Sequence, residues 1–251
     1  MNTVAQIRVL AKQLALSNLA NRPFEFLSEP VSSEQLLLDC LKDEVAYREQ
    51  KARERRIRQA QIPTFKDFDS FDTEFQQGIT PWQLQQLKNL TWIEGVYNLI
   101  LIGPPGTGKT PLALAIGNKA LQQGYKVFFA SMDNLIHILK TGEISRKSQA
   151  RLKWIKEADL LIIDELGYLP IGRLEANLFF QLISQLYENT SVVITSNKGF
   201  DGWAELLGDS VLATALLDRL THRCQVLSFA DNSYRLAHRK EIFDHHDATQ
   251  N

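Results

Sequence analysis

The feature that most constrains this chain is a glycine-rich segment that lies between an apolar run and a helical pattern. The apolar run at 96–102 (VYNLILI) is followed by GPPGTGKT at 103–110, which matches the phosphate-loop pattern G-x-x-x-x-G-K-[ST]. Glycines let backbone amides approach a phosphate closely, and the next helix presents the positive end of its dipole there. The pattern therefore predicts a nucleoside-triphosphate site between a strand and a helix.

The residues expected to contact ATP are those of the loop and of the first turn of the helix. They are Gly103, Pro104, Pro105, Gly106, Thr107, Gly108, Lys109, Thr110 and Pro111. We expect Lys109 to reach the β- and γ-phosphates and the Thr110 hydroxyl to bind Mg²⁺, so ATP and Mg²⁺ are the predicted cofactors. Pro111 is unusual here because its ring disfavours helical geometry at Thr110, although its missing N–H costs little in a first turn. We expect the helix to tolerate it with some adjustment.

A second polar cluster ends the apolar run at 159–164, in the segment DLLIIDELG. Asp164 and Glu165 are expected at the carboxyl edge of a parallel sheet, beside the phosphate loop. We assign Asp164 to the Mg²⁺ shell and Glu165 to the polarisation of the attacking water; the alternative for the pair is a helix cap. Asn197 follows another apolar run and is expected to bind the attacking water or the γ-phosphate, with a plain turn residue as the alternative.

The first third of the chain carries helical patterns. Apolar residues recur mostly every three or four positions over 3–20, which predicts an amphipathic helix. A capping box at Ser32 and Gln35 begins a long helix that Pro63 ends, and the second half of this helix is mostly basic. An aromatic-rich linker then leads into a helix from about Pro81, where proline suits the first helical position.

Short apolar runs alternate with longer helical segments in the rest of the chain. The runs lie at 96–102, 125–130, 159–164, 191–196 and 225–229. This alternation predicts an α/β fold with a parallel sheet and helices on both faces. We therefore expect a small N-terminal helical domain (1–62), a linker and helix (63–95), a nucleotide-binding core (96–243) and a polar tail (244–251).

Charge and cysteine content exclude some classes of protein. The formal net charge of the 251 residues is −1, so any affinity for nucleic acid must come from a local basic patch. Cys40 and Cys224 fit no metal or disulfide spacing. The N-terminus lacks a signal-peptide pattern, and no apolar run is long enough to span a membrane. We expect a cytoplasmic protein.

Several segments together resemble a known family. GPPGTGKT, LLIIDELGYLP, LFFQLISQLYE, ITSNKGF and LLDRLTHRCQVLSF, closing with NSYRL, resemble the IstB-like ATPases in order and spacing over residues 50–243. These are the helper proteins of insertion-sequence transposition and are related to the DnaC-type helicase loaders and the DnaA initiators. The resemblance implies a P-loop NTPase of AAA+ type with a five-stranded parallel sheet, flanking helices and no C-terminal lid.

The resemblance also implies roles for single residues. Asn197 matches the sensor-1 position, and Arg219, in LLDRL, matches an arginine finger that reaches the ATP of a neighbouring subunit. The alternative for Arg219 is a salt bridge on a helix. Lys109, Glu165, Asn197 and Arg219 would then be the catalytic residues of a homo-oligomer whose ATP sites are shared between subunits.

Two basic regions compete for the binding of DNA. The first is the helix over 48–58, for which an ordinary solvated face is the alternative. The second lies between the second and third apolar runs, and its predicted DNA contacts are Lys140, Arg146, Lys147, Arg151 and Lys153, with an ordinary basic helix as the alternative. Neither region carries a base-reading motif, so we expect salt-dependent contacts to the phosphates of duplex DNA, largely independent of sequence.

These features favour an ATP-dependent helper that oligomerises on duplex target DNA, hydrolyses ATP and stimulates or targets a partner transposase of the IstA-like kind. The main alternative is a replicative helicase loader of DnaC type; the segments DELGYLP and LFFQLISQLYE favour the transposition branch. A small-molecule phosphotransferase is a third class, but it would need a substrate pocket and an arginine-bearing lid, for which no segment is evident.

Overall fold

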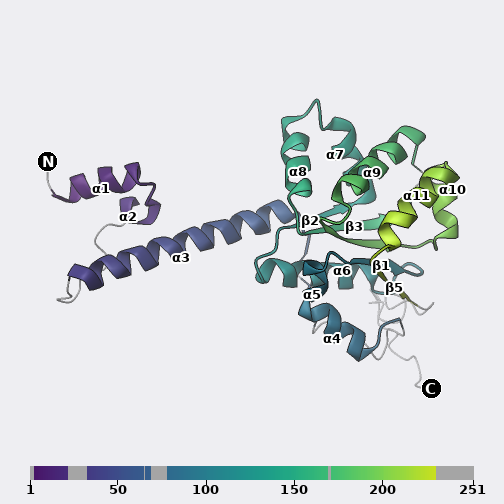
Figure 1. Cartoon of the computed structure of the whole chain (residues 1–251), viewed down its shortest axis with the longest axis horizontal. Helices are drawn as coiled ribbons and strands as arrows, with labels where there is room; N and C mark the ends of the chain where they lie inside the picture. The colour runs from purple at the N-terminus through teal and green to yellow at the C-terminus, as the bar shows by residue number, and fades with distance from the viewer. Residues whose placement is uncertain (1–2, 22–32, 65, 69–77, 169–170, 230–251) are drawn as a thin grey trace, which may run out of the picture. The chain divides into compact units, whose positions relative to one another are not determined.

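The computed structural model describes residues 3–21, 33–64, 66–68, 78–168 and 171–229 (Figure 1). The chain forms two compact units that divide between Arg58 and Gln59, near the end of a long helix. The smaller unit is helical, and the larger unit holds the sheet.

The N-terminal unit contains α1 (Thr3–Gln13), α2 (Ser17–Asn21) and nearly all of α3 (Ser33–Ala60). The prediction of one amphipathic helix over 3–20 is wrong, because the chain turns at Ala15, whose φ is 54°. The Leu16 N–H donates back to the Ala11 carbonyl at 2.8 Å and so ends α1. The predicted long helix is confirmed as α3, whereas Ser32, its expected cap, lies outside the described residues.

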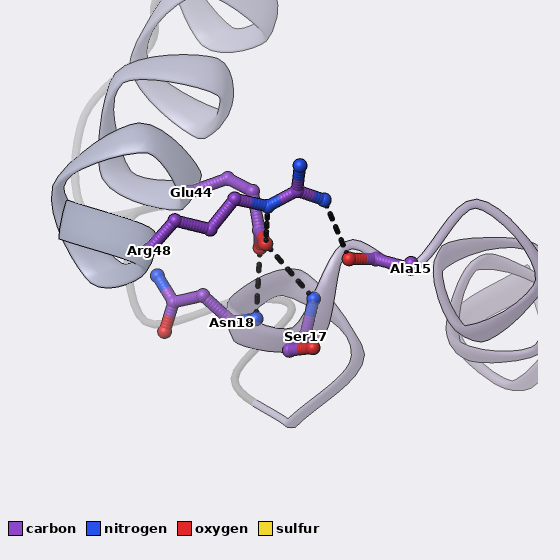
Figure 2. A network of polar contacts seen from close by, with 5 residues as sticks. All are labelled: Ala15, Ser17, Asn18, Glu44 and Arg48. Carbon is purple, nitrogen blue, oxygen red and sulfur yellow. Dashed lines mark hydrogen bonds and ion pairs between the residues drawn. The ribbon is translucent and has the colours of Figure 1, made fainter. Parts of the chain in front are cut away.

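A buried carboxylate ties the turn after α1 to α3 (Figure 2). Glu44 accepts hydrogen bonds from the N–H groups of Ser17 at 3.0 Å and Asn18 at 2.8 Å, the first residues of α2. Arg48, one turn further along α3, donates to Glu44 at 3.0 Å and to the Ala15 carbonyl at 2.6 Å. Burial alone would raise the pKa of Glu44, but the hydrogen bonds from Arg48 and these N–H groups outweigh it and lower that pKa. An ionised side chain from α3 therefore caps α2.

We expect Glu44→Gln to destabilise the N-terminal unit by about 1–3 kcal/mol at pH 7, because a neutral amide binds the same donors less strongly. The pKa of Glu44 is lower in the folded state, so its contribution is fully present above the unfolded value of about 4.3 and is lost as pH falls through the folded value. Urea unfolding of wild type and variant at pH 7 and at about pH 3, followed by circular dichroism, measures the difference.

The difference in unfolding free energy between the two proteins should narrow at the lower pH. Glu49→Gln is the matched control, because Glu49 is an exposed carboxylate on the same helix, and it should leave stability unchanged at both pH values. A gap for Glu44→Gln that does not depend on pH would show that the charge of Glu44 has no part in holding α2.

The larger unit is built on five parallel strands: β1 (Asn98–Ile102), β2 (Val127–Ser131), β3 (Leu160–Leu166), β4 (Ser191–Ser196) and β5 (Cys224–Ser228). Their order across the sheet is β2-β3-β4-β1-β5, so β1 lies between β4 and β5. The strands fall on the five predicted apolar runs, which confirms the α/β fold with a five-stranded parallel sheet. In such sheets, ligands bind beyond the carboxyl ends of the strands.

Helices cover both faces of this sheet (Figure 1). One face carries α4 (Pro81–Asn89), α5 (Thr91–Glu94) and α6 (Lys109–Gln122). The other face carries α7 (Met132–Thr141), α8 (Arg146–Lys156), α9 (Arg173–Leu186), α10 (Asp201–Leu207) and α11 (Ser210–Thr221). Successive side chains of a strand point to opposite faces of the sheet and so contribute to both hydrophobic cores. Leu160 of β3 packs in the core on the α6 face, and Leu161 packs in the core on the α9 face.

Helix α4 begins where the sequence predicts. Thr80 is its cap, since the Gln83 N–H donates to the Thr80 hydroxyl at 3.2 Å and the Thr80 N–H donates to the Gln83 side chain at 2.9 Å. Pro81 then takes the first helical position, where its missing N–H costs nothing.

Strand β5 is the last element of the described residues, and the predicted tail 244–251 lies outside them. Among the described helices, none combines the length and the apolar character needed to cross a membrane.

Candidate active site

The phosphate loop joins β1 to α6 at the carboxyl ends of the strands. The Gly103 N–H donates to the Ser196 carbonyl at the end of β4, at 3.1 Å. Gly103 has a φ of 155°, and a Cβ at this position would lie 2.7 Å from the Phe229 carbonyl oxygen. A larger residue would force the backbone to shift, which explains the glycine that begins the loop.

Lys109, the first residue of α6, folds back into the loop. Its ammonium donates to the carbonyls of Gly103 and Pro104, at 2.6 Å each, and lies 3.3 Å from Thr107 Oγ1. The residue is 8% exposed. A buried cation at a helix N-terminus, held by neutral carbonyls, fits the phosphates of a nucleotide, because anionic oxygens form the stronger hydrogen bonds.

Pro111 lies on the exposed side of the first turn of α6. The helix begins at Lys109 as the phosphate-loop pattern requires, and the Leu112 N–H donates to the Gly108 carbonyl at 3.1 Å. Thr110 is therefore helical despite the proline that follows it.

Asp164, in β3, is 6% exposed, and its carboxylate accepts hydrogen bonds from two hydroxyl groups. Thr110 donates to Asp164 Oδ1 at 2.9 Å, and Thr195 of β4 donates to the same oxygen at 2.5 Å. Thr110 and Asp164 thus bring two side-chain oxygens together beside the phosphate loop. Oxygen donors of this kind, combined with the phosphates of a nucleotide, are what Mg²⁺ prefers in proteins.

Glu165 follows Asp164 in the chain but is exposed. Its φ is 63°, a left-handed value that is uncommon outside glycine, and the register between β3 and β4 shifts between Ile163 and Leu166. The Glu165 N–H donates to Thr195 Oγ1 at 2.9 Å. This bulge gives neighbouring carboxylates different surroundings: one is buried among hydroxyls, and the other is open to water.

Asn197 directly follows β4 and lies beside the end of β3. Gly167, with a φ of 100°, leaves space for it, since a Cβ on Gly167 would lie 3.0 Å from Asn197 Oδ1. The carboxyl edge of the sheet therefore gathers the side chains predicted to act there, which are Lys109, Thr110, Asp164, Glu165 and Asn197. Thr195 joins this group although the sequence assigns it no role; its only signal is a position at the end of a buried strand.

Arg219 lies apart from this group, near the end of α11. Its guanidinium stacks over the Phe180 ring at 4.7 Å and donates to the Ala215 carbonyl at 3.1 Å. It borders a small cavity that also touches Asn98 and Val192, at the beginnings of β1 and β4. The phosphate loop follows the other end of β1, a strand that spans about 16 Å. Within one chain, Arg219 and the phosphate loop are thus at opposite edges of the sheet.

Two of the five predicted DNA contacts have partners within the chain. Lys140 of α7 forms an ion pair with Glu175 of α9, with 2.8 Å between Nζ and Oε1, and this hydrogen bond lowers the pKa of Glu175. Arg151 of α8 donates to the Gln61 side chain at 3.2 Å. The charge of Lys140 is therefore largely balanced by a carboxylate, whereas Arg151 is held by a neutral group.

The other three, Arg146, Lys147 and Lys153, are exposed on α8. No ion pair joins them to another residue in the part of the chain that the structure describes. In the competing basic helix, by contrast, Arg48 is engaged by Glu44 and Lys51 lies 3.1 Å from a carboxylate oxygen of Glu54. Helix α8 therefore presents three exposed cations without an ion pair among the described residues, whereas carboxylates engage two of the cations of α3.

The profile of one protein family, described as IstB-like ATP binding protein, matches residues 9–242. The chain belongs to this family. The match includes most of the helical N-terminal unit as well as the whole sheet, so this IstB-like protein resembles its family over both units.

Individual relatives agree with the family match. The IstB-like chain is 39% identical over 240 residues to a Pseudomonas aeruginosa protein named for ATP binding and for insertion sequence IS21, covering 94% of this chain and 91% of the relative. It is 35% identical over 210 residues to a Geobacillus stearothermophilus protein named for ATP binding and for insertion sequence IS5376, covering 84% of each.

Solved structures share the fold at low sequence identity. The crystal structure of DnaI matches with a TM-score of 0.56 and 19% identity, over 66% of this chain and 91% of DnaI. The DnaC helicase loader matches with a TM-score of 0.54 and 22% identity, over 65% of this chain and 96% of DnaC. These likenesses concern the fold alone, and they agree with the predicted parallel sheet between layers of helices.

Proposed function

We propose that this IstB-like protein is a Mg²⁺-dependent ATPase that oligomerises on duplex DNA and presents it to a partner transposase of the IstA-like kind. The proposal rests on the convergence of a phosphate-loop lysine, a threonine–aspartate pair and an exposed carboxylate at one edge of the sheet. The names of the relatives, which join ATP binding to insertion sequences, favour a role in transposition.

Each residue has a part in the hydrolysis of ATP to ADP and phosphate. Lys109 would bind the β- and γ-phosphates, and Thr110 and Asp164 would hold Mg²⁺, which would neutralise the charge that develops on the phosphate oxygens. Glu165 polarises the attacking water and accepts its proton. Asn197 orients that water or the γ-phosphate.

The position of Arg219 supports sites that are shared between subunits. An arginine at the far edge of the sheet cannot complete the site of its own chain, but it can reach the ATP of a neighbour packed against that edge. ATP binding would then favour assembly, and hydrolysis would favour release.

The DNA-binding part of the proposal is supported by the exposed cations of α8. We expect Arg146→Ala/Lys147→Ala to weaken duplex binding about tenfold or more and to reduce the slope of log affinity against log salt by about 2, since each lost phosphate contact removes about 0.9. Fluorescence anisotropy at several salt concentrations measures both quantities.

The comparison variant for this measurement is Arg53→Ala/Arg55→Ala, in the competing basic helix. We expect it to leave the salt slope unchanged. If this variant reduces the salt slope and the α8 variant leaves it unchanged, the DNA contacts belong to α3 and not to α8.

The proposed function as a whole is tested by electron microscopy and sedimentation with ATP and a duplex of about 50 base pairs, a length that offers many phosphate contacts. Wild type should form ATP-dependent assemblies on the duplex, and Lys109→Ala, which loses the phosphate contact, should not. Assemblies that bind a replicative helicase and no transposase would replace the proposal with a helicase loader. ATP hydrolysis without any binding to DNA would overturn it.

A further inference from the structure

We propose that Thr195 is a positioning residue that holds Asp164 and Glu165 in their separate tasks. The inference rests on the proposed ATP hydrolysis and adds a residue that neither the sequence patterns nor the family resemblance assigns. Thr195 is buried at the end of β4, with 2% of its surface exposed, so it acts through its neighbours and not by contact with ATP.

A single hydroxyl links both acidic residues. Thr195 Oγ1 donates to the Asp164 side chain at 2.5 Å and accepts from the Glu165 backbone N–H at 2.9 Å. A backbone N–H can only donate, so the hydroxyl must use a lone pair toward Glu165, and its own proton is left for Asp164. The direction of this short chain of hydrogen bonds is therefore fixed, and in a buried site each bond polarises and strengthens the next.

The hydrogen bond between Thr195 and the Glu165 N–H lies at a residue whose backbone conformation is unfavourable by itself. Glu165 has a φ of 63° at a bulge in β3, and a left-handed conformation at a non-glycine residue persists only when its surroundings hold it. Thr195 supplies such a hold from the neighbouring strand. A shift of Glu165 back toward extended geometry would turn its carboxylate away from the attacking water.

The bond to Asp164 complements that of Thr110. Both threonines donate to the same oxygen, Asp164 Oδ1. If the Thr110 oxygen binds Mg²⁺, Thr195 would be the threonine that orients the carboxylate without binding the ion itself. Residues that hydrogen-bond to a metal ligand orient that ligand. Their removal typically lowers metal affinity or activity by about 10–100-fold.

The test compares Thr195→Val, which has nearly the same shape without the hydroxyl, with Thr195→Ser, which keeps the hydroxyl. We expect Thr195→Val to lower kcat for ATP hydrolysis about 10–100-fold and to raise the Mg²⁺ concentration needed for half-maximal binding of a fluorescent ATP analogue. Its KM for ATP should change less than about threefold, because Lys109 and the loop are intact. Thr195→Ser should stay within about threefold of wild type in all three quantities.

Thermal unfolding shows whether each variant is folded. If Thr195→Val does not fold, Thr195→Cys replaces it in the test, because a thiol is a much weaker hydrogen-bond donor and acceptor than the threonine hydroxyl. Wild-type kcat in the hydroxyl-free variant, or a Thr195→Ser variant as slow as Thr195→Val, would overturn the role of Thr195. Absence of hydrolysis in wild type itself, with ATP, Mg²⁺ and duplex DNA present, would instead overturn the proposed function, and the inference with it.

Discussion

Glu165→Gln should retain ATP binding and hydrolyse ATP at least about 100-fold more slowly than wild type, because a neutral amide cannot accept the proton of the attacking water. Glu165 is exposed and takes no part in the hydrogen bond between Thr110 and Asp164, so its replacement leaves the two proposed Mg²⁺ ligands in place. The loss should therefore appear in kcat, with little change in the affinity for nucleotide. Single-turnover hydrolysis and equilibrium binding of ATP measure the two effects separately.

The matched control is Glu157→Gln. Glu157 is an exposed carboxylate that forms an ion pair with Lys126. It precedes β3 and so lies at the amino edge of the sheet, opposite to the phosphate loop, and its replacement should leave hydrolysis unchanged. Because Glu165→Gln should hold ATP without consuming it, the variant should also keep its assemblies on duplex DNA for longer than wild type. Hydrolysis close to the wild-type rate would remove Glu165 from the role of base.

The gathering of the candidate site's residues at one edge of the sheet could be predicted from the sequence because its signals are local. The phosphate loop, the strand that ends in Asp164 and the strand before Asn197 are each contained in a short run of residues. Parallel strands bring such runs to one edge of a sheet whatever the intervening helices are, so the fold follows from the alternation of runs and helices. The same reasoning explains why all five strands fall on the predicted runs.

Features that depend on distant residues escaped prediction. After the break that ends α1, the next helix is capped by the carboxylate of Glu44, more than 20 residues away from the N–H groups of Ser17 and Asn18, and periodicity carries no such information. The link from Thr195 to Glu165 crosses from β4 to β3 at a bulge, and a bulge has no reliable sequence signature. Tertiary contacts, and not local propensity, decide both cases.

Arg219 illustrates a further limit, because its proposed partner belongs to another chain. We expect Arg219→Ala to bind ATP and to lose hydrolysis about 1000-fold or more within assemblies, since an arginine supplied to a phosphoryl-transfer site stabilises the charge of the transition state. Arg223→Ala is the matched control: Arg223 is exposed, lies four residues further along and donates to the Gly95 carbonyl at 3.3 Å. It should hydrolyse ATP at the wild-type rate.

Mixing two inactive variants separates a finger that acts on a neighbour from an arginine that acts within its own chain. A site formed by the nucleotide pocket of Arg219→Ala and the arginine of a neighbouring Glu165→Gln subunit contains every catalytic group. Equal amounts of the two proteins should therefore restore hydrolysis in about a quarter of the sites of a mixed head-to-tail assembly, although each protein alone is inactive. Mixed assemblies that stay inactive would show that Arg219 acts within its own subunit. The structure argues against that outcome, because the length of β1 separates Arg219 from the phosphate loop of the same chain.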